Sequence, residues 1–165
     1  MTVLPDVLVH DLDVVFCGSA VGAASAQRRG YYAGPGNAFW PTLAEVELTP
    51  HLVKPEEYIS ITRYGLGLTD LAKTISGQDS ILRKAHFDIE GLRTKILKYR
   101  PRLLAFTSKR AAQEFVGRPV AYGRMTDTIG DTNLFVLPSP SGAARRYWSV
   151  KPWLELAVLK GSARS

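Results

Sequence analysis

Two segments of the chain are rich in small residues and directly follow apolar runs. The first, Gly18–Gly22, reads GSAVG and comes after the mostly apolar residues 13–17. The second, Pro138–Arg146, reads PSPSGAARR and comes after the apolar residues 134–137. Small residues let a backbone approach a ligand closely, and backbone N–H groups can stabilise an anion there. We therefore predict that the two segments together form a binding site.

The segment Gly30–Trp40, GYYAGPGNAFW, combines two adjacent tyrosines, a Gly-Pro-Gly turn and the start of a helix. Phe39 and Trp40 open that helix, and we expect both side chains in the hydrophobic core. Tyr31 or Tyr32 lies on the loop before it, where a tyrosine ring can stack on a flat ligand ring. The pattern therefore indicates a planar ligand near the two small-residue segments.

Short apolar runs alternate along the chain with segments of helical spacing. Helix starts are indicated at Pro55 and, by their N-cap residues, at Asp88 and Ser108. The alternation is typical of a doubly wound α/β sandwich with a mainly parallel sheet. Ligands of such folds bind beyond the carboxyl ends of the strands, where both small-residue segments fall. We expect buried strands over residues 13–17, 103–107 and 134–137, and helices over residues 39–46, 89–99, 109–116 and 149–160.

The composition is that of an ordinary globular protein. The chain has 165 residues, 45% of them hydrophobic and 22% charged, and we expect one domain over residues 1–165. One cysteine, Cys17, excludes an internal disulfide framework, and three scattered histidines argue against a metal site. No apolar run approaches the roughly 20 residues that cross a bilayer, and the N-terminus does not resemble a secretion signal. We therefore expect a cytoplasmic monomer with no metal, cofactor or membrane partner.

The charge balance favours a polyanionic partner. The net charge is +6 at pH 7, and Lys and Arg side chains that neutralise phosphates gain affinity by releasing counterions.

The chain contains neither the dinucleotide fingerprint Gly-x-Gly-x-x-Gly nor the Walker motif ending in Gly-Lys-Ser/Thr. A Rossmann-type enzyme acting on small nucleotides is therefore disfavoured, and thermal stabilisation by a nucleotide would be needed to revive it.

Three motifs, taken in order, resemble those of the uracil-DNA glycosylase superfamily. They are Gly18–Gly22, Tyr32–Trp40 and Leu137–Gly142, and the resemblance extends from about Asp13 to about Leu156. The motifs look most like those of the mismatch-specific uracil/thymine-DNA glycosylases, and the hypoxanthine-DNA glycosylases look related. The resemblance implies a three-layer α/β/α sandwich around a parallel sheet. It also implies an enzyme of base excision repair that flips a damaged base out of DNA and hydrolyses its N-glycosidic bond.

The first motif usually reads Gly-Ile-Asn-Pro-Gly in the family, and its backbone lines the base pocket. By resemblance, Gly18, Ser19 and Ala20 contact the substrate in this chain. The third position normally holds an asparagine that binds the attacking water, which Ala20 cannot do. Tyr32 matches an aromatic residue that stacks on the flipped base. Such stacking contributes about 1–3 kcal/mol, which offsets much of the cost of flipping.

The segment Ser139–Ala143 matches a family motif that usually reads Asn-Pro-Ser-Gly-Leu and enters the minor groove of DNA. Ala143 replaces the leucine that fills the gap left by the flipped base, so we expect a preference for mismatched or single-stranded DNA. Insertion of Arg145, Arg146 or Tyr147 is the alternative. The resemblance assigns substrate binding to Ser139, and it assigns DNA binding to Ser141, Gly142, Ala143, Arg145 and Arg146.

Breaking an N-glycosidic bond places positive charge on the sugar, which a nearby carboxylate stabilises. Asp70 matches a polar pocket position of the family and is our first candidate for orienting water and stabilising that charge. A loop or cap aspartate is the structural alternative. Asn37 is the second candidate, because it matches an asparagine implicated in catalysis by the hypoxanthine enzymes. Its alternative role is to close the Gly-Pro-Gly turn. Asp79 is a third candidate and is more simply a helix cap.

No lysine occupies a matching pocket position, so we expect a monofunctional enzyme that leaves an abasic site without Schiff-base chemistry. The alternative function is a DNA-binding module that keeps the pocket but has lost the chemistry. Ala20 favours that alternative, whereas Asn37 and Asp70 oppose it. Uracil opposite guanine, thymine, alkylated cytosines and deaminated purines all stay open as substrates.

Some other residues have simpler interpretations. We expect Cys17, at the end of an apolar strand, to be buried core rather than a nucleophile. Lys95 and Lys98 are expected on the solvated face of an amphipathic helix. Arg28 and Arg29 precede the tyrosines and are candidates for contact with the opposite DNA strand.

Overall fold

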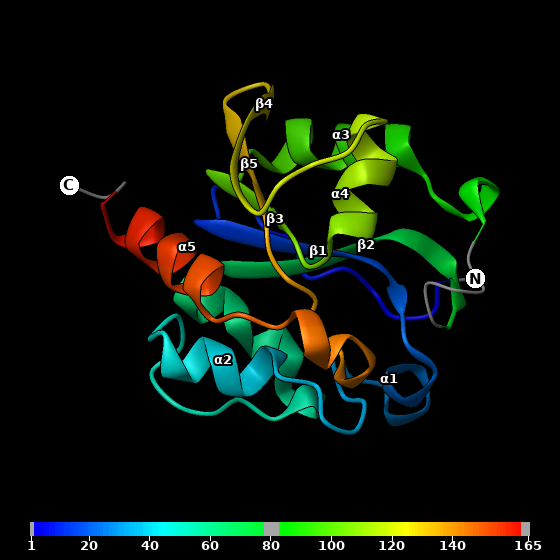
Figure 1. Ribbon diagram of the computed structural model, residues 1–165, viewed down its shortest axis with the longest axis vertical. Coiled ribbons are helices and arrows are strands. Elements are labelled where there is room, and N and C mark those ends of the chain that lie inside the picture. The colour runs from blue at the N-terminus through cyan, green and yellow to red at the C-terminus, as the bar shows by residue number, and fades with distance from the viewer. Residues whose placement is uncertain (1, 78–82, 163–165) are drawn as a thin grey trace.

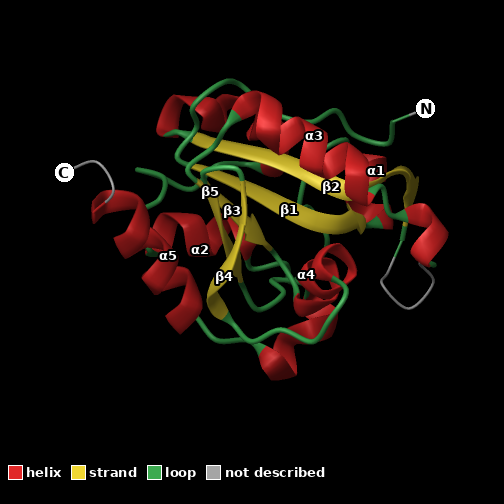
Figure 2. Cartoon of the chain, turned by 90° about the horizontal axis from the view of Figure 1, so that it is seen from above, coloured by secondary structure: helices red, strands yellow, loops and turns green. Residues whose placement is uncertain are grey.

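A five-stranded sheet forms the centre of the protein in a computed structural model that describes residues 2–77 and 83–162. Its spatial order is β2-β1-β3-β5-β4, and the first four strands are parallel, whereas β4 pairs antiparallel with β5. Figure 2 shows the strands from above. The predicted fold class, an α/β sandwich with a mainly parallel sheet, is confirmed. The strands are β1 (Val14–Val21), β2 (Leu66–Ser76), β3 (Leu103–Phe106), β4 (Gly123–Ile129) and β5 (Thr132–Val136).

Helices cover both faces of the sheet, as Figure 1 shows. One face is covered by α3 (Ile89–Tyr99) and α4 (Lys109–Val116). The opposite face is covered by α2 (Phe39–Glu45), the 3-10 helix η1 (Pro55–Tyr64) and α5 (Lys151–Ser162). The remaining short helices are α1 (Ala23–Arg28), η3 (Lys84–His86) and η4 (Gly142–Tyr147). This is the three-layer arrangement that the resemblance implied.

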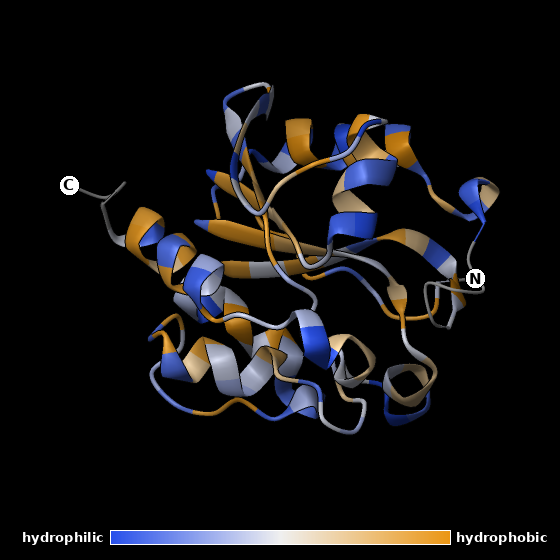
Figure 3. Ribbon diagram, viewed as in Figure 1, coloured by the Kyte–Doolittle hydropathy of each residue, from blue (hydrophilic) through white to orange (hydrophobic). Residues whose placement is uncertain are grey.

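The core consists of two hydrophobic clusters separated by the sheet. Successive side chains of a strand point to opposite faces, so Phe16 joins Phe39 and Trp153 on one side, while Cys17 joins Phe106 on the other. Because β1 is covered on both faces, its first half must be apolar throughout. The central strands accordingly show mostly apolar colours in Figure 3. Cys17 is fully buried, as predicted, and burial followed by the charge of Asp70 raises the pKa of its thiol.

The helix ends that follow β2 and β3 agree with their predicted caps. The Asp88 side chain accepts a hydrogen bond from the Gly91 N–H, and the Ser108 hydroxyl accepts one from the Ala111 N–H. Such bonds satisfy donors that the first helical turn cannot use internally. The helix α3 ends just before Pro101, which cannot continue it.

Three features of the sheet differ from the sequence prediction. The strand β1 continues through residues 18–21, which were expected to be a turn, because these residues pair with β2. The strand β2 was not predicted, since its glycine and its polar residues interrupt the apolar pattern. The hairpin strand β4 was also missed, because it lies at an edge of the sheet and only its first and last residues are buried, so it contains no apolar run. Asp79 lies outside the described residues.

The described residues contain neither a helix that could cross a membrane nor a cluster that could bind a metal ion. No helix there is both long enough and apolar enough to cross a membrane. The same part of the chain contains no group of three or more His, Cys, Asp or Glu side chains arranged to hold a metal ion.

Candidate functional site

A cavity of about 630 Å³ lies beyond the carboxyl ends of the parallel strands. The strand β3 pairs with β1 only as far as Cys17, so in the described sheet residues 18–21 have no strand partner on that side. The cavity opens along this edge and is bordered by Thr107 and Ser108, which directly follow β3. Its far wall is the segment that follows β5. The two small-residue segments therefore face each other across one cavity.

Most of the predicted site residues are brought together here, although they come from four separate parts of the sequence. Arg145 and Arg146 lie on η4 next to the cavity and are exposed. The predicted residues that line the cavity are Gly18, Ser19, Ala20, Tyr32, Asn37, Asp70, Ser139, Ser141, Gly142 and Ala143.

The tyrosine segment and the segment after β5 are fastened to each other. The Ala38 N–H donates a hydrogen bond to the Pro140 carbonyl oxygen at 2.8 Å. A methyl group on Gly36 would lie 2.8 Å from a guanidinium nitrogen of Arg145, and Gly36 has a φ of 71°. The left-handed φ favours glycine there, whereas the guanidinium is the end of a flexible, exposed side chain that can move aside. The hydrogen bond between Ala38 and Pro140 joins two motifs that are about a hundred residues apart in the chain.

Tyr32 places an aromatic surface on the cavity wall. One face of its ring stacks on Phe39, with centroids 3.9 Å apart and ring planes inclined by 17°. Its hydroxyl lies 3.0 Å from Thr107 Oγ1, and burial raises the pKa of that hydroxyl, so it stays neutral. The ring is only half-buried, so its other face is the one that a planar ligand can contact. Tyr31, by contrast, is 2% exposed.

Asp70 lies opposite Gly18 in the pairing of β1 with β2 and is 4% exposed. A methyl group on Gly18 would lie 3.1 Å from Asp70 Oδ1, 3.4 Å from Tyr32 Oη and 3.5 Å from Thr107 Oγ1. The missing side chain of Gly18 therefore leaves a space on which three oxygen atoms converge. A water molecule or a polar edge of a ligand can be held at such a point.

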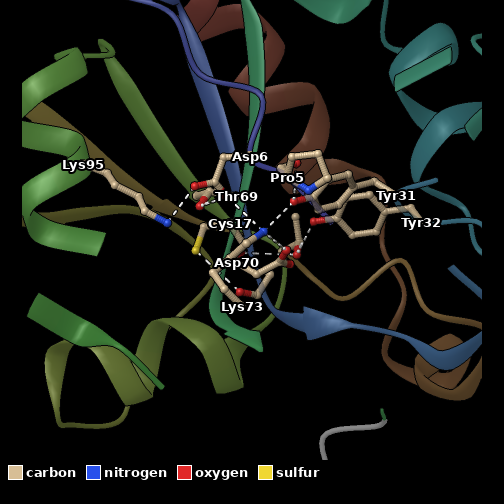
Figure 4. A network of polar contacts seen from close by, with 11 residues as sticks. Pro5, Asp6, Cys17, Tyr31, Tyr32, Thr69, Asp70, Lys73 and Lys95 are labelled. Carbon is tan, nitrogen blue, oxygen red and sulfur yellow. Dashed lines mark hydrogen bonds and ion pairs between the residues drawn. The ribbon is translucent and has the colours of Figure 1, made fainter. Parts of the chain in front are cut away.

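Lys73 neutralises the charge of Asp70. Its ammonium group lies 3.0 Å from Asp70 Oδ2, 3.0 Å from Asp6 Oδ1 and 2.8 Å from Tyr31 Oη, as drawn in Figure 4. Burial raises the pKa of Asp70, and the attraction of Lys73 only partly offsets this. Burial also disfavours the charged form of Lys73, but Asp70 and Asp6 outweigh it and raise the pKa of the ammonium group. The pair is therefore a half-buried cation beside a buried carboxylate that is unusually easy to protonate.

Comparison with known proteins identifies the family. The family model described as "Uracil DNA glycosylase superfamily" matches residues 5–160. The chain belongs to this superfamily. A candidate uracil DNA glycosylase from Methanosarcina acetivorans, solved by solution NMR, has the same fold with a TM-score of 0.60. It is 24% identical in sequence, and the match covers 96% of this chain and 95% of that one. Membership supports DNA glycosylase activity, a hydrolase function in DNA repair, with DNA as the substrate.

Asn37 has a local structural role in this glycosylase fold as well as a place on the cavity wall. Its Oδ1 accepts a hydrogen bond from the Phe39 N–H at 2.9 Å, and its own N–H donates to the Gly34 carbonyl oxygen. These bonds close the turn before α2, which was the structural alternative for this residue. The side-chain NH₂ group is then the donor that Asn37 can offer to a ligand.

Two basic residues have partners that the sequence did not indicate. Arg28 pairs with Glu56 at 2.5 Å and donates to the Ala33 carbonyl oxygen, so it fastens the tyrosine loop. Lys95 lies 2.7 Å from Asp6 Oδ2. The prediction that Lys95 belongs only to a solvated helix face is therefore wrong, whereas Lys98 is exposed as expected.

Thr107 and Lys73 are site residues that were not predicted from the sequence. Thr107 could have been predicted, because it lies at the carboxyl end of a predicted buried strand, where the two small-residue segments also begin. Lys73 was not, because strand alternation would place residues 70 and 73 on opposite faces. The pairing with β1 advances from Ala20–Ala72 to Val21–Ser76, and this irregularity turns Lys73 toward Asp70.

Proposed function

We propose that the protein is a monofunctional DNA glycosylase of the mismatch-specific uracil type, which excises uracil or a related deaminated or mismatched base. The observation that carries the proposal is the convergence of an aromatic face and a carboxylate on one cavity. Tyr32 and Asp70 come from different segments, yet both border the space beside Gly18. A flipped base stacked on Tyr32 would bring its sugar bond near Asp70.

The proposed chemistry uses residues of this chain only. The bond between the sugar C1′ and the base nitrogen breaks, and the base leaves with the electron pair. Asp70 Oδ1 stabilises the oxocarbenium-like sugar and orients the water that attacks C1′. The attacking water gives its proton to Asp70, from which it returns to solvent, and the base anion is protonated as it is released. Among the described cavity-lining residues there is no lysine, which fits hydrolysis that leaves an abasic site.

An excision assay tests the proposal directly. Oligonucleotides that contain uracil, in single strands or opposite guanine or adenine, are incubated with the protein and analysed on gels before and after alkali. We expect strand cleavage only after alkali, since the abasic site remains intact. Binding of the oligonucleotide without any alkali-sensitive product would instead support the DNA-binding module that Ala20 suggests.

We predict faster excision from mismatched or single-stranded DNA than from a paired adenine–uracil duplex. Ala143 is exposed at the cavity mouth and is too small to fill the gap left by a flipped base. Flipping costs a few kcal/mol and costs least when the base is unpaired. Ala143→Leu should therefore raise single-turnover excision on the paired duplex and change the single-stranded rate little. Highest wild-type activity on paired duplex would contradict this prediction.

Tyr147 is the side chain best placed to supply the missing contact. It is 64% exposed, lines the cavity mouth and carries the Arg146 guanidinium 5.4 Å from its ring centre. Tyr147→Ala should therefore widen the difference between the single-stranded and duplex rates. An unchanged ratio of the two rates would show that a side chain other than Tyr147 fills the gap left by the flipped base.

The exposed arginines of η4 are expected to set the salt dependence of DNA binding. Each phosphate contact contributes about 0.7–0.9 to the slope of log affinity against log salt concentration. The double variant Arg145→Ala/Arg146→Ala should lower that slope by about 1.4–1.8 if both side chains contact phosphates. Fluorescence anisotropy over a salt series measures it. Lys98→Ala is the matched control, because Lys98 is on α3, away from the residues that line the cavity. Equal slopes for the wild type and the double variant would show that neither arginine contacts a DNA phosphate.

A further inference from the structure

Four charged side chains of alternating sign connect helix α3 to the cavity. Lys95 lies 2.7 Å from Asp6, Asp6 lies 3.0 Å from Lys73, and Lys73 lies 3.0 Å from Asp70. Figure 4 shows the row running from Lys95 on one side to the two tyrosines on the other. The row joins α3, the N-terminal segment and β2, so it does not belong to any one element. Only its last member, Asp70, borders the cavity.

Lys73 is held in one position within this row. An ammonium group has three N–H donors, and those of Lys73 have three oxygen partners, on Asp70, Asp6 and Tyr31. Its side chain is 13% exposed. The two carboxylates beside the ammonium group keep it protonated, so it acts as a fixed positive charge and not as a nucleophile.

The contact leaves the two oxygens of Asp70 in different surroundings. Oδ2 is bound by Lys73 at 3.0 Å, whereas Oδ1 is the oxygen nearest to the space beside Gly18. A carboxylate that is fixed through one oxygen presents the other in a defined direction. The same contact opposes the effect of burial, which favours the neutral acid.

We propose that Lys73 is a positioning residue that keeps Asp70 ionised near neutral pH and directs its Oδ1 atom into the cavity. This inference rests on the proposed glycosylase function and deepens it. Behind Lys73, Asp6 pairs with both Lys73 and Lys95 and so fixes the place of the Lys73 ammonium group.

The pH dependence follows from the charges that surround Asp70. Asp6 opposes the ionisation of Asp70, whereas Lys73 and the Tyr31 hydroxyl favour it. Burial raises the pKa of both Cys17 and Tyr32, so these groups stay neutral in the relevant range. The titratable groups that face Asp70 are Lys73 on β2, Asp6 in the N-terminal segment, Tyr31 and Tyr32 in the tyrosine loop and Cys17 on β1, with Lys95 of α3 behind Asp6.

Single-turnover excision should rise with pH as Asp70 loses its proton, since the carboxylate is the active form. Lys73→Met removes the charge and keeps the length of the side chain. An opposite charge at this distance shifts a carboxyl pKa by about 1–3 units, so the acid limb should move to higher pH by about that amount. Lys73→Arg should restore most of the wild-type profile. Lys98→Met, on the exposed face of α3, is the matched control and should not move it.

Titration of the Asp70 carboxyl carbon by NMR gives a second measurement that does not depend on activity. The same upward shift is expected in Lys73→Met, and superimposable titrations in wild type and variant would overturn the inference. A wild type that excises no base would count against the proposed function alone, because the titration would still test Lys73. If Lys73→Met does not fold, Asp6→Asn/Lys73→Met is compared with Asp6→Asn, so that the two proteins differ only in the charge at position 73. Superimposable Asp70 titrations in that pair would also overturn the inference.

Discussion

Replacing Asp70 by asparagine is expected to lower the single-turnover rate of base excision by about 10²–10⁴-fold. The asparagine has nearly the same shape, but it can neither accept the proton of the attacking water nor carry the charge that stabilises the sugar cation. Asp70 is the one described carboxylate that lines the cavity, so no other acid there can replace it. The rate is measured with excess enzyme on an oligonucleotide containing uracil opposite guanine.

Two controls separate chemistry from folding and binding in this experiment. The circular dichroism spectrum and the melting profile should remain those of a folded protein, because Lys73 keeps its contacts with Asp6 and Tyr31. The affinity for uracil-containing DNA should change by only a few-fold. A folded variant that excises uracil at the wild-type rate would show that Asp70 is not the catalytic carboxylate.

Tyr32→Ala is expected to lower kcat/KM by about 5–150-fold, which corresponds to the loss of about 1–3 kcal/mol of stacking. The Tyr32 ring presents one face to the cavity while Phe39 supports the other, so its removal leaves a flipped base without its platform. The effect should be largest for duplex substrates, because stacking helps to offset the cost of flipping.

Tyr32→Phe is the matched control for this prediction. It keeps the ring and removes only the hydroxyl that contacts Thr107 at 3.0 Å, so kcat/KM should stay within a few-fold of wild type. Melting temperatures of both variants measure the part of the loss that comes from packing on Phe39. Equal losses in the two variants would point to the hydroxyl, rather than the ring, as the important group.

Much of the fold follows from local patterns. The apolar runs of β1, β3 and β5 needed to be buried on both faces, and such strands are recognisable without knowledge of their neighbours. The caps at Asp88 and Ser108 lie within three residues of the N–H groups that they bind, so the sequence contains the whole interaction. The strand β2 has no such local signal, because its burial depends on the pairing with β1 and on cover from the N-terminal segment.

The cavity is predictable in outline for a related reason. In a mainly parallel sheet, segments that follow different strands meet at one edge, so the two small-residue segments had to lie near each other. Their fastening through the hydrogen bond between Ala38 and Pro140 required the folded chain. Local pattern alone left Tyr31 and Tyr32 with equal claims as the stacking residue, and the family resemblance favoured Tyr32.

The amino-acid sequence by itself determined the layered architecture, the small-residue walls of the cavity and the superfamily, because each is written in residues close together or in motifs of fixed order. Only the tertiary structure decided that Asp70 lies beside Lys73 and Asp6, with Gly18 opening the space in front of it. The physical reason is that a buried charge depends on partners from distant segments. An irregular strand pairing, which no local pattern encodes, turned Lys73 to the same side as Asp70.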